Sequence, residues 1–82
     1  EVNVPKVVSG SERERLRRAF RQLTDHERET CSLIADGLSN GEIAERLVIQ
    51  PASAKRAVSR ILSKLGMRDR TQIAVSWYRA GL

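Results

Sequence analysis

The chain has 82 residues and a formal net charge of +5, from 15 lysines and arginines against 10 acidic residues. A chain of this length forms one domain with a thin core, which argues against an enzyme with a closed catalytic cleft. One cysteine excludes an internal disulfide and fits a reducing compartment. No apolar run approaches the length of a membrane span.

The chain opens with a segment that lacks helical periodicity. Residues 1–10 contain a proline and a Ser-Gly pair, which favours a linker. From residue 11 the pattern changes, because Leu16, Ala19 and Phe20 fall on one face of a helix whose other positions carry arginines. We therefore expect a linker followed by a first helix over 11–22.

Helix starts are marked by a capping residue followed three positions later by Glu or Gln. In such a capping box the first side chain accepts from a backbone amide and the second reaches back to the cap amide, which satisfies donors that a helix start leaves unpaired. Four matches, each followed by periodic apolar residues, indicate an all-α fold. They are Ser11 with Glu14, Thr24 with Glu27, Ser39 with Glu42, and Asp69 with Gln72.

Glycines and a proline mark the ends of the other expected helices. Gly37 and Gly66 are suited to the left-handed residue that ends a helix. Pro51 suits a first helical position, since its missing amide proton costs nothing there. No strand pattern is present. The expected ranges are 25–36, 40–47, 51–65 and 70–80.

A short helix, a tight turn and a longer basic helix follow the helix-turn-helix plan, in which the second helix enters the major groove of DNA. Basic residues concentrate between 50 and 70, where Asp69 is the only acid. The apolar residues of the longer helix share one stripe, so its opposite face carries small and cationic side chains. Such a face can fit a groove roughly 12 Å wide. The residues expected to reach that groove are Lys55, Arg56, Ser59 and Arg60.

The last expected helix has apolar residues on more than one side. Ile73, Trp77 and Ala80 form its core stripe. A second, partly apolar patch is left uncovered, and on a DNA-binding domain such a patch suggests a two-fold dimer interface. That patch consists of Thr71, Ala74, Val75 and Tyr78.

Catalytic and metal-binding patterns are missing from the sequence. Cys31 lies on an apolar face without a second thiol, which favours a buried core position. His26 lies among carboxylates at a helix start, without a zinc-binding spacing, which favours a solvated side chain. No glycine-rich phosphate loop and no nucleophile elbow occurs. We expect no enzymatic activity, no cofactor and no bound metal.

Three segments carry a family resemblance: LTDHERETCSLIADGLSNGEIAERL, SAKRAVSRILSKLG and RTQIAVSWYRAGL. Over residues 23–82 the chain resembles the LuxR/NarL (FixJ, GerE) type of DNA-binding domain, and the KLGMRDRTQ join is most similar to response-regulator output domains. The resemblance implies a four-helix unit that binds duplex DNA as a dimer and follows a receiver, a sensor or a large ATP-binding regulator. The expected division is a linker and N-terminal helix over 1–22 and the DNA-binding unit over 23–82.

The resemblance also implies roles for single residues, carried over by position. It places Lys55, Arg56 and Ser59 at base edges or facing the groove, and it places Ser39, Asn40 and Ser53 near the phosphate backbone. Lys64 is expected to add a further phosphate contact.

Three departures from the family pattern lie in or next to the basic helix. Gln50 stands where the family often has serine, Ala54 where it has valine, and Ala57 where it has histidine. Loss of the serine cap weakens the helix start by about 0.5–2 kcal/mol. The small side chain at Ala57 removes a groove contact, so the preferred DNA sequence need not follow the family.

Together these features predict the cytoplasmic output domain of a bacterial transcription regulator. We expect it to bind double-stranded DNA through residues 51–65 as a homodimer on two half-sites, with RNA polymerase as a further candidate partner and no membrane association. Two alternatives stay open. The three departures allow a protein-interaction module that keeps the scaffold without specific DNA binding. Promoter recognition by a sigma-factor region 4, which has a similar helix-turn-helix, is the other, and the extra helix after KLG argues against it.

Overall fold

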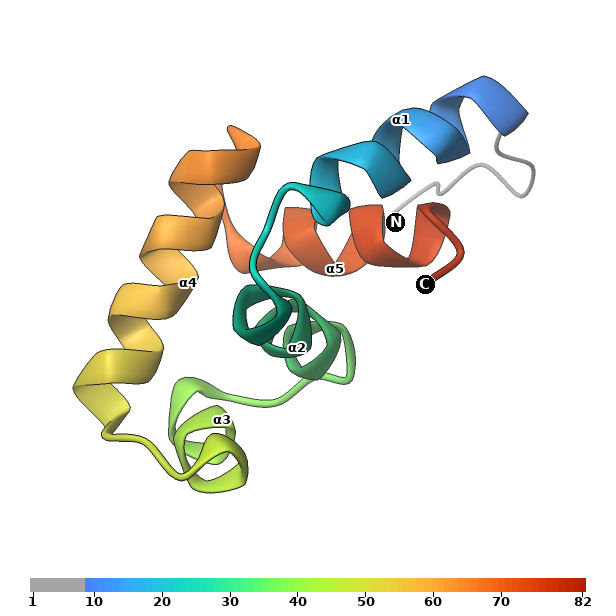
Figure 1. Ribbon diagram of the computed structural model, residues 1–82. Helices are drawn as coiled ribbons and strands as arrows, with labels where there is room; N and C mark the ends of the chain where they lie inside the picture. The colour runs from blue at the N-terminus through green and yellow to red at the C-terminus, as the bar shows by residue number, and fades with distance from the viewer. Residues whose placement is uncertain (1–8) are drawn as a thin grey trace.

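The computed structural model describes residues 9–82, and this part of the chain forms helices and the loops between them (Figure 1). The predicted all-α fold is confirmed. The helices predicted over 40–47 and 51–65 have those bounds. The other three end one residue early, because Gln22, Asp36 and Ala80 form C-caps. The helices are α1 (Gly10–Arg21), α2 (Asp25–Ala35), α3 (Asn40–Leu47), α4 (Pro51–Leu65) and α5 (Arg70–Arg79).

The start of α1 differs from the prediction. The cap predicted at Ser11 is wrong, because Ser9 caps the helix and its Oγ accepts from the Glu12 amide over 3.1 Å. Both serines stand three positions before a glutamate, so the sequence pattern fits either one. The linker predicted over 1–10 is too long at its end, because Ser9 caps α1 and Gly10 is its first residue, and the rest of that linker, residues 1–8, lies outside the described residues.

The other three predicted caps accept the expected amide hydrogen bond. The capping boxes at Thr24 and Ser39 are complete, with each glutamate side chain accepting from the cap amide. At Asp69 the side chain accepts from the Gln72 amide, but Gln72 Oε1 accepts from the Arg68 amide, one residue before the cap. Each of these caps joins residues three positions apart in the sequence.

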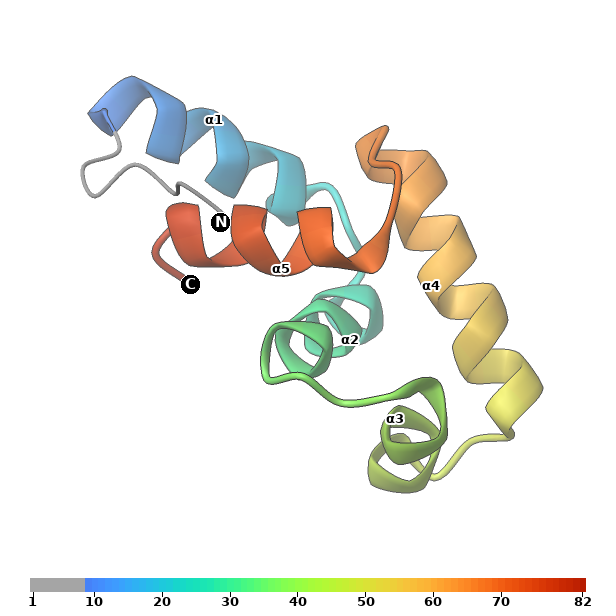
Figure 2. The same ribbon diagram turned by 180° about the vertical axis from the view of Figure 1, so that it is seen from behind.

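Every helix contributes to one hydrophobic core. Helix α2 packs mainly against α5, and α3 packs mainly against α4 (Figure 1). Seen from behind, α1 and α5 run side by side (Figure 2). Within residues 9–82, no helix is long and apolar enough to span a membrane. Fully buried side chains come from each helix in turn: Phe20, Cys31, Ile43, Ile61 and Ile73.

Helix α1 is anchored on α5. The Phe20 ring meets the Trp77 ring edge-on, with centroids 5.0 Å apart and planes at 82°, a favoured aromatic geometry. Arg17 Nε donates to the Ala80 carbonyl over 2.7 Å, and Arg79 pairs with Glu12. The N-terminal helix is therefore packed into the domain that follows it.

The turn between α3 and α4 carries an unusual backbone conformation. Val48, the C-cap of α3, is left-handed with φ 57° and is the one non-glycine residue with positive φ among residues 9–82. The Ile49 amide donates to the Ala44 carbonyl over 2.9 Å. Gln50 caps α4 without a side-chain hydrogen bond, so the weak cap expected at this position is confirmed. Pro51 occupies the first turn of α4 as predicted.

Candidate nucleic-acid interface

Helix α4 presents three stripes to different surroundings. Ala54, Val58 and Ile61 are buried in the core, as predicted. A second stripe points to solvent, and a third faces α2, because positions three and four apart share one side of a helix. The solvent stripe consists of Ala52, Lys55, Arg56, Ser59 and Ser63, and the stripe toward α2 consists of Ser53, Ala57, Arg60 and Lys64.

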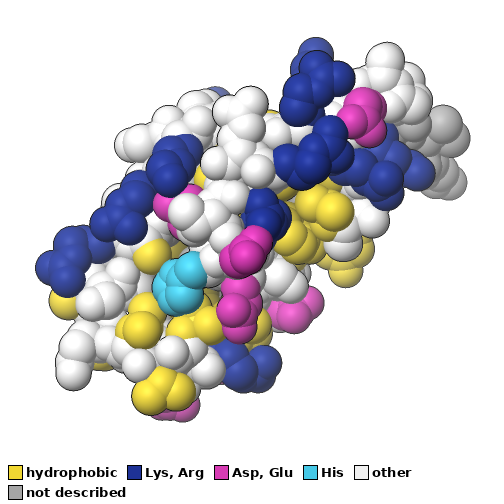
Figure 3. Space-filling model, in the orientation of Figure 1, with side chains coloured by type: hydrophobic (Ala, Val, Ile, Leu, Met, Phe, Trp, Pro, Cys, Tyr) yellow, Lys and Arg dark blue, Asp and Glu magenta, His cyan; other side chains and the backbone are white. Residues whose placement is uncertain are grey.

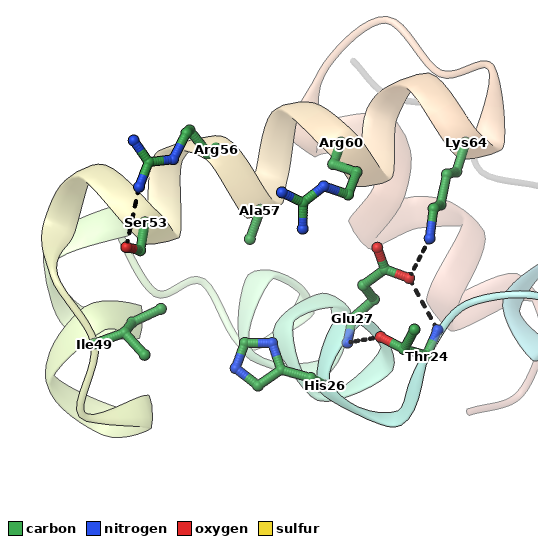
Figure 4. A pocket seen from close by; sticks show the side chains of 9 residues that line it. All are labelled: Thr24, His26, Glu27, Ile49, Ser53, Arg56, Ala57, Arg60 and Lys64. Atoms are coloured by element: carbon green, nitrogen blue, oxygen red, sulfur yellow. Dashed lines mark hydrogen bonds and ion pairs between the residues drawn. The ribbon is translucent and has the colours of Figure 1, made fainter.

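All four residues predicted to reach a DNA groove are exposed. Arg56 Nη2 makes a long hydrogen bond of 3.4 Å to Ser53 Oγ, which leaves the guanidinium free to turn outward. Arg60 differs from Lys55 and Ser59 in its direction. It lies on the stripe toward α2, and its guanidinium points into the space in front of Ala57 (Figure 4).

The residues predicted to contact phosphate are already hydrogen-bonded within the chain. Ser39 Oγ accepts from the Glu42 amide, and Asn40 Oδ1 accepts from Arg70 Nη1 over 2.8 Å. Lys64 Nζ donates to Glu27 Oε1 over 2.8 Å, and Ser53 accepts the long bond from Arg56. These bonds orient the side chains, and their contact with DNA stays a prediction.

Glu27 is a buried carboxylate that links α2 to α4. Its side chain is 5% exposed, whereas that of Lys64 is 43% exposed. The same Oε1 atom also accepts from the Thr24 amide over 2.9 Å. The hydrogen bond from Lys64 lowers the pKa of Glu27 below its ordinary value of 4.5, and the bond from Thr24 adds to this effect. The carboxylate therefore stays ionised and holds α4 at a set position beside α2.

An open groove of about 470 Å³ runs between the first turn of α2 and the stripe of α4 that faces it (Figure 4). His26 borders it from α2, and Arg56 and Arg60 border it from α4. Ala57 lies between the two arginines and is buried, so it forms the floor and does not face outward. The expected loss of a DNA contact at Ala57 stays a prediction, and the structure places this position at the groove toward α2.

His26 is a residue that the sequence analysis left as merely solvated. Its side chain is exposed, and it stands beside the cations of α4. The space-filling view shows lysines and arginines along the α4 edge, with the single histidine of the chain next to them (Figure 3). Acidic side chains lie on the other side of that histidine (Figure 3). The sequence signal was its place directly before the capping-box glutamate.

The candidate dimer residues lie along one side of α5. Tyr78 is 76% exposed and Thr71 is also exposed, whereas Ala74 and Val75 are half-buried. Thr71, Ala74 and Val75 border a shallow depression between α5 and the loop that follows α2. The core stripe predicted for this helix is confirmed, since Ile73 and Ala80 are fully buried and Trp77 packs against the core.

Cys31 is a buried core thiol, as predicted. Burial raises the pKa of Cys31 to about 12, and the nearby Glu27 carboxylate adds to the effect. The thiolate form needed for nucleophilic chemistry is therefore suppressed. Within residues 9–82, no group of three or more His, Cys, Asp or Glu side chains is arranged to hold a metal ion.

Comparison with known proteins assigns a family to these features. Residues 21–77 match the family described as bacterial regulatory proteins, luxR family. The chain is 49% identical over 53 residues to the DNA-binding transcriptional activator DevR/DosR of Mycobacterium tuberculosis, covering 65% of this chain and 24% of that protein. It is 47% identical over 60 residues to the transcriptional regulatory protein LnrK of Bacillus subtilis, covering 73% and 27%. It is 43% identical over 63 residues to the response regulator protein VraR of Staphylococcus aureus, covering 77% and 30%.

The chain therefore spans about a quarter of the length of these curated relatives. No solved structure gave a significant match.

Proposed function

The chain belongs to the luxR family of bacterial regulatory proteins, and we propose that it regulates transcription by binding double-stranded DNA with α4 in the major groove. The observation that carries this proposal is the solvent stripe of α4. Its opposite stripe is buried in the core, yet Lys55, Arg56 and Ser59 are exposed. A helix with a narrow, cationic outer face has the shape and charge that a major groove accepts.

The proposed contacts divide into two kinds. Base-edge contacts from the solvent stripe provide sequence preference, and phosphate contacts provide most of the affinity and its salt dependence. Lys55, Arg56, Ser59 and Arg60 are proposed for the groove, and Ser39, Asn40, Ser53 and Lys64 for the phosphates.

We further propose that two copies bind two half-sites, paired through α5. Tyr78 supports this, because a large exposed aromatic side chain is suited to a protein contact. The interface would consist of Thr71, Ala74, Val75 and Tyr78, and the two-fold axis of the dimer would match that of the operator.

The proposal extends to the protein from which this unit comes. Similarity to VraR, named a response regulator, supports a longer regulator in which a receiver domain precedes residues 23–82 and RNA polymerase is a partner. Because bacterial chromosomal DNA lies in the cytoplasm, the proposal places the protein there. No catalytic role is part of it.

An NMR titration tests the DNA-binding proposal. A duplex selected from a random pool by the protein itself serves as the ligand, and backbone amide shifts are followed. We expect the shifts to map to residues 39–63, while the outer face of α1 stays unchanged. Silence over 39–63 would contradict the proposal and favour a protein-interaction module built on the same scaffold.

A further inference from the structure

The groove between α2 and α4 is lined by polar and cationic side chains, and the DNA contacts proposed above do not use it as a binding site. Its floor is formed by Ala57, which is small and buried, and by Ile49, which is half-buried. Neither side chain fills the space above the floor. Its rims are polar, with His26 on the α2 side and Arg60 on the α4 side (Figure 4). A residue larger than alanine at position 57 would fill this space.

The charges around the groove are only partly neutralised. Lys64 donates to the buried Glu27, so this pair adds no net charge. Asp25, next to His26, pairs with Arg28. Among residues 9–82, the side chains of Arg60 and His26 make no hydrogen bond and no ion pair, and His26 is engaged only at its backbone carbonyl, which accepts from the Thr30 hydroxyl. The groove therefore holds two arginines without a carboxylate partner, beside an exposed imidazole.

We propose that this groove holds a phosphodiester of one DNA strand, bound jointly by His26 from α2 and Arg60 from α4. The inference rests on the proposed function and adds a phosphate site to it. A helix in the major groove presents its outer face to the base edges and its flanks to the sugar-phosphate walls. The stripe of Arg60 is such a flank, and α2 brings His26 to the same side.

The proposed site changes the role of Arg60. Predicted as a groove residue, it becomes a phosphate ligand, while Lys55, Arg56 and Ser59 keep the base edges. An imidazolium next to a phosphate is favoured over a neutral imidazole, so binding takes up one proton from solvent at His26. The charged groups across the groove from His26 are Arg56, Arg60 and Lys64 on α4, and those near it on its own helix are Asp25, Glu27 and Glu29.

The test measures binding of a fluorescent duplex by anisotropy between about pH 5.5 and pH 8, the range in which histidine changes charge. The wild-type affinity should rise as the pH falls, with a slope of log K against pH approaching about one at its steepest. His26→Gln should bind without this slope, at the wild-type affinity of high pH. His26→Arg should also lose the slope, at the wild-type affinity of low pH.

Salt dependence gives a second readout that a structural role would not change. Each phosphate contact contributes about 0.9 to the slope of log K against log salt concentration. The salt slope of wild type should therefore be steeper at low pH than at high pH, by about 0.9. His26→Arg should have the steep, low-pH slope of wild type at both pH values. Arg60→Gln should lower the slope by about 0.9. Arg15→Gln removes the same charge from an exposed position on α1 that does not line the groove, and it should leave the slope unchanged.

The outcomes separate this inference from the function on which it rests. If wild type binds DNA with amide shifts on α4, but His26→Gln keeps the wild-type pH slope, the phosphate site is wrong and the proposed function stands. If wild type fails to bind the selected duplex, both fail. Circular dichroism melting of each variant excludes unfolding as the cause, and because His26 is exposed the melting temperatures should match.

Discussion

Lys64 on α4 donates from Nζ to the buried Oε1 of Glu27 on α2 over 2.8 Å, across 37 positions of sequence. The same oxygen accepts from the Thr24 amide, so one carboxylate caps α2 and holds α4 beside it. The two helices joined in this way border the groove that carries His26 and Arg60. The position of the basic helix relative to its neighbour thus depends on an ion pair that is buried on one side.

Replacement of this carboxylate should lower stability in a pH-dependent way. Glu27→Gln keeps the side-chain shape but removes the charge that Lys64 and the Thr24 amide bind, and we expect it to cost about 1–3 kcal/mol at pH 7. The pKa of Glu27 is lowered in the folded state. Its contribution is therefore present above the ordinary value of 4.5 and is lost as the pH falls through the lower, folded value.

Urea unfolding of wild type and Glu27→Gln at pH 7 and at about pH 3 measures this effect. The quantity compared is the difference in free energy of unfolding between the two proteins, in which the other acidic residues cancel because both proteins contain them. The difference between the two proteins should shrink at the lower pH. An equal difference at both would show that the charge of Glu27 does not stabilise the fold.

Relief of the left-handed backbone at Val48 should stabilise the protein. A β-branched residue at φ 57° is strained, and the side chain is 89% exposed, so little packing is lost on its removal. Val48→Gly relieves the backbone strain of the folded state, but it also raises the conformational entropy of the unfolded chain, which offsets part of that gain. We expect a net gain of about 1 kcal/mol by thermal unfolding. A lower melting temperature than wild type would contradict the assignment of strain.

The uncapped start of α4 offers a separate gain. Gln50 makes no side-chain cap bond, and a serine there can accept from an amide of the first turn. We expect Gln50→Ser to raise the free energy of unfolding by about 0.5–2 kcal/mol. Gln50→Ala is the control, since it supplies no acceptor and should bring no gain. Equal stability of the two variants would count against a missing cap.

Base preference should depend on the solvent stripe of α4. We expect Arg56→Ala to lose roughly 1–3 kcal/mol more on a selected duplex than on a random one, because a bidentate contact to a base distinguishes sequences. Lys64→Gln should lower affinity for both duplexes alike, since phosphate contacts carry no sequence information. Binding titrations on the two duplexes provide the comparison. Equal losses on both duplexes for Arg56→Ala would rule out its role in base recognition.

Pairing through α5 should be visible on DNA with two half-sites. Tyr78→Glu places a charge on the exposed apolar side of α5. We expect it to weaken binding to a two-half-site duplex by roughly tenfold, equivalent to about 1.4 kcal/mol, with no change on a single half-site. Gel-shift titrations on both duplexes measure this. A similar loss on the single half-site would argue for a defect in folding or DNA contact and against a dimer interface.

Features that depend on neighbouring residues were predictable from the sequence alone. The bounds of α3 and α4, the capping boxes at Thr24 and Ser39, and the buried stripe of α4 all follow from patterns within a few positions. Such patterns act through backbone amides and helix periodicity, which need no tertiary contact. Where two local solutions were equal, as for Ser9 and Ser11, the sequence could not choose between them.

Features that join distant positions were decided by the tertiary structure. The angle at which two helices cross determines which long side chains meet, and no local pattern encodes it. For this reason the sequence did not predict the anchoring of Phe20 on Trp77, or the pairing of Glu27 with Lys64. The same crossing of α2 and α4 turns Arg60 toward His26, and so creates the groove in which we propose that phosphate binds.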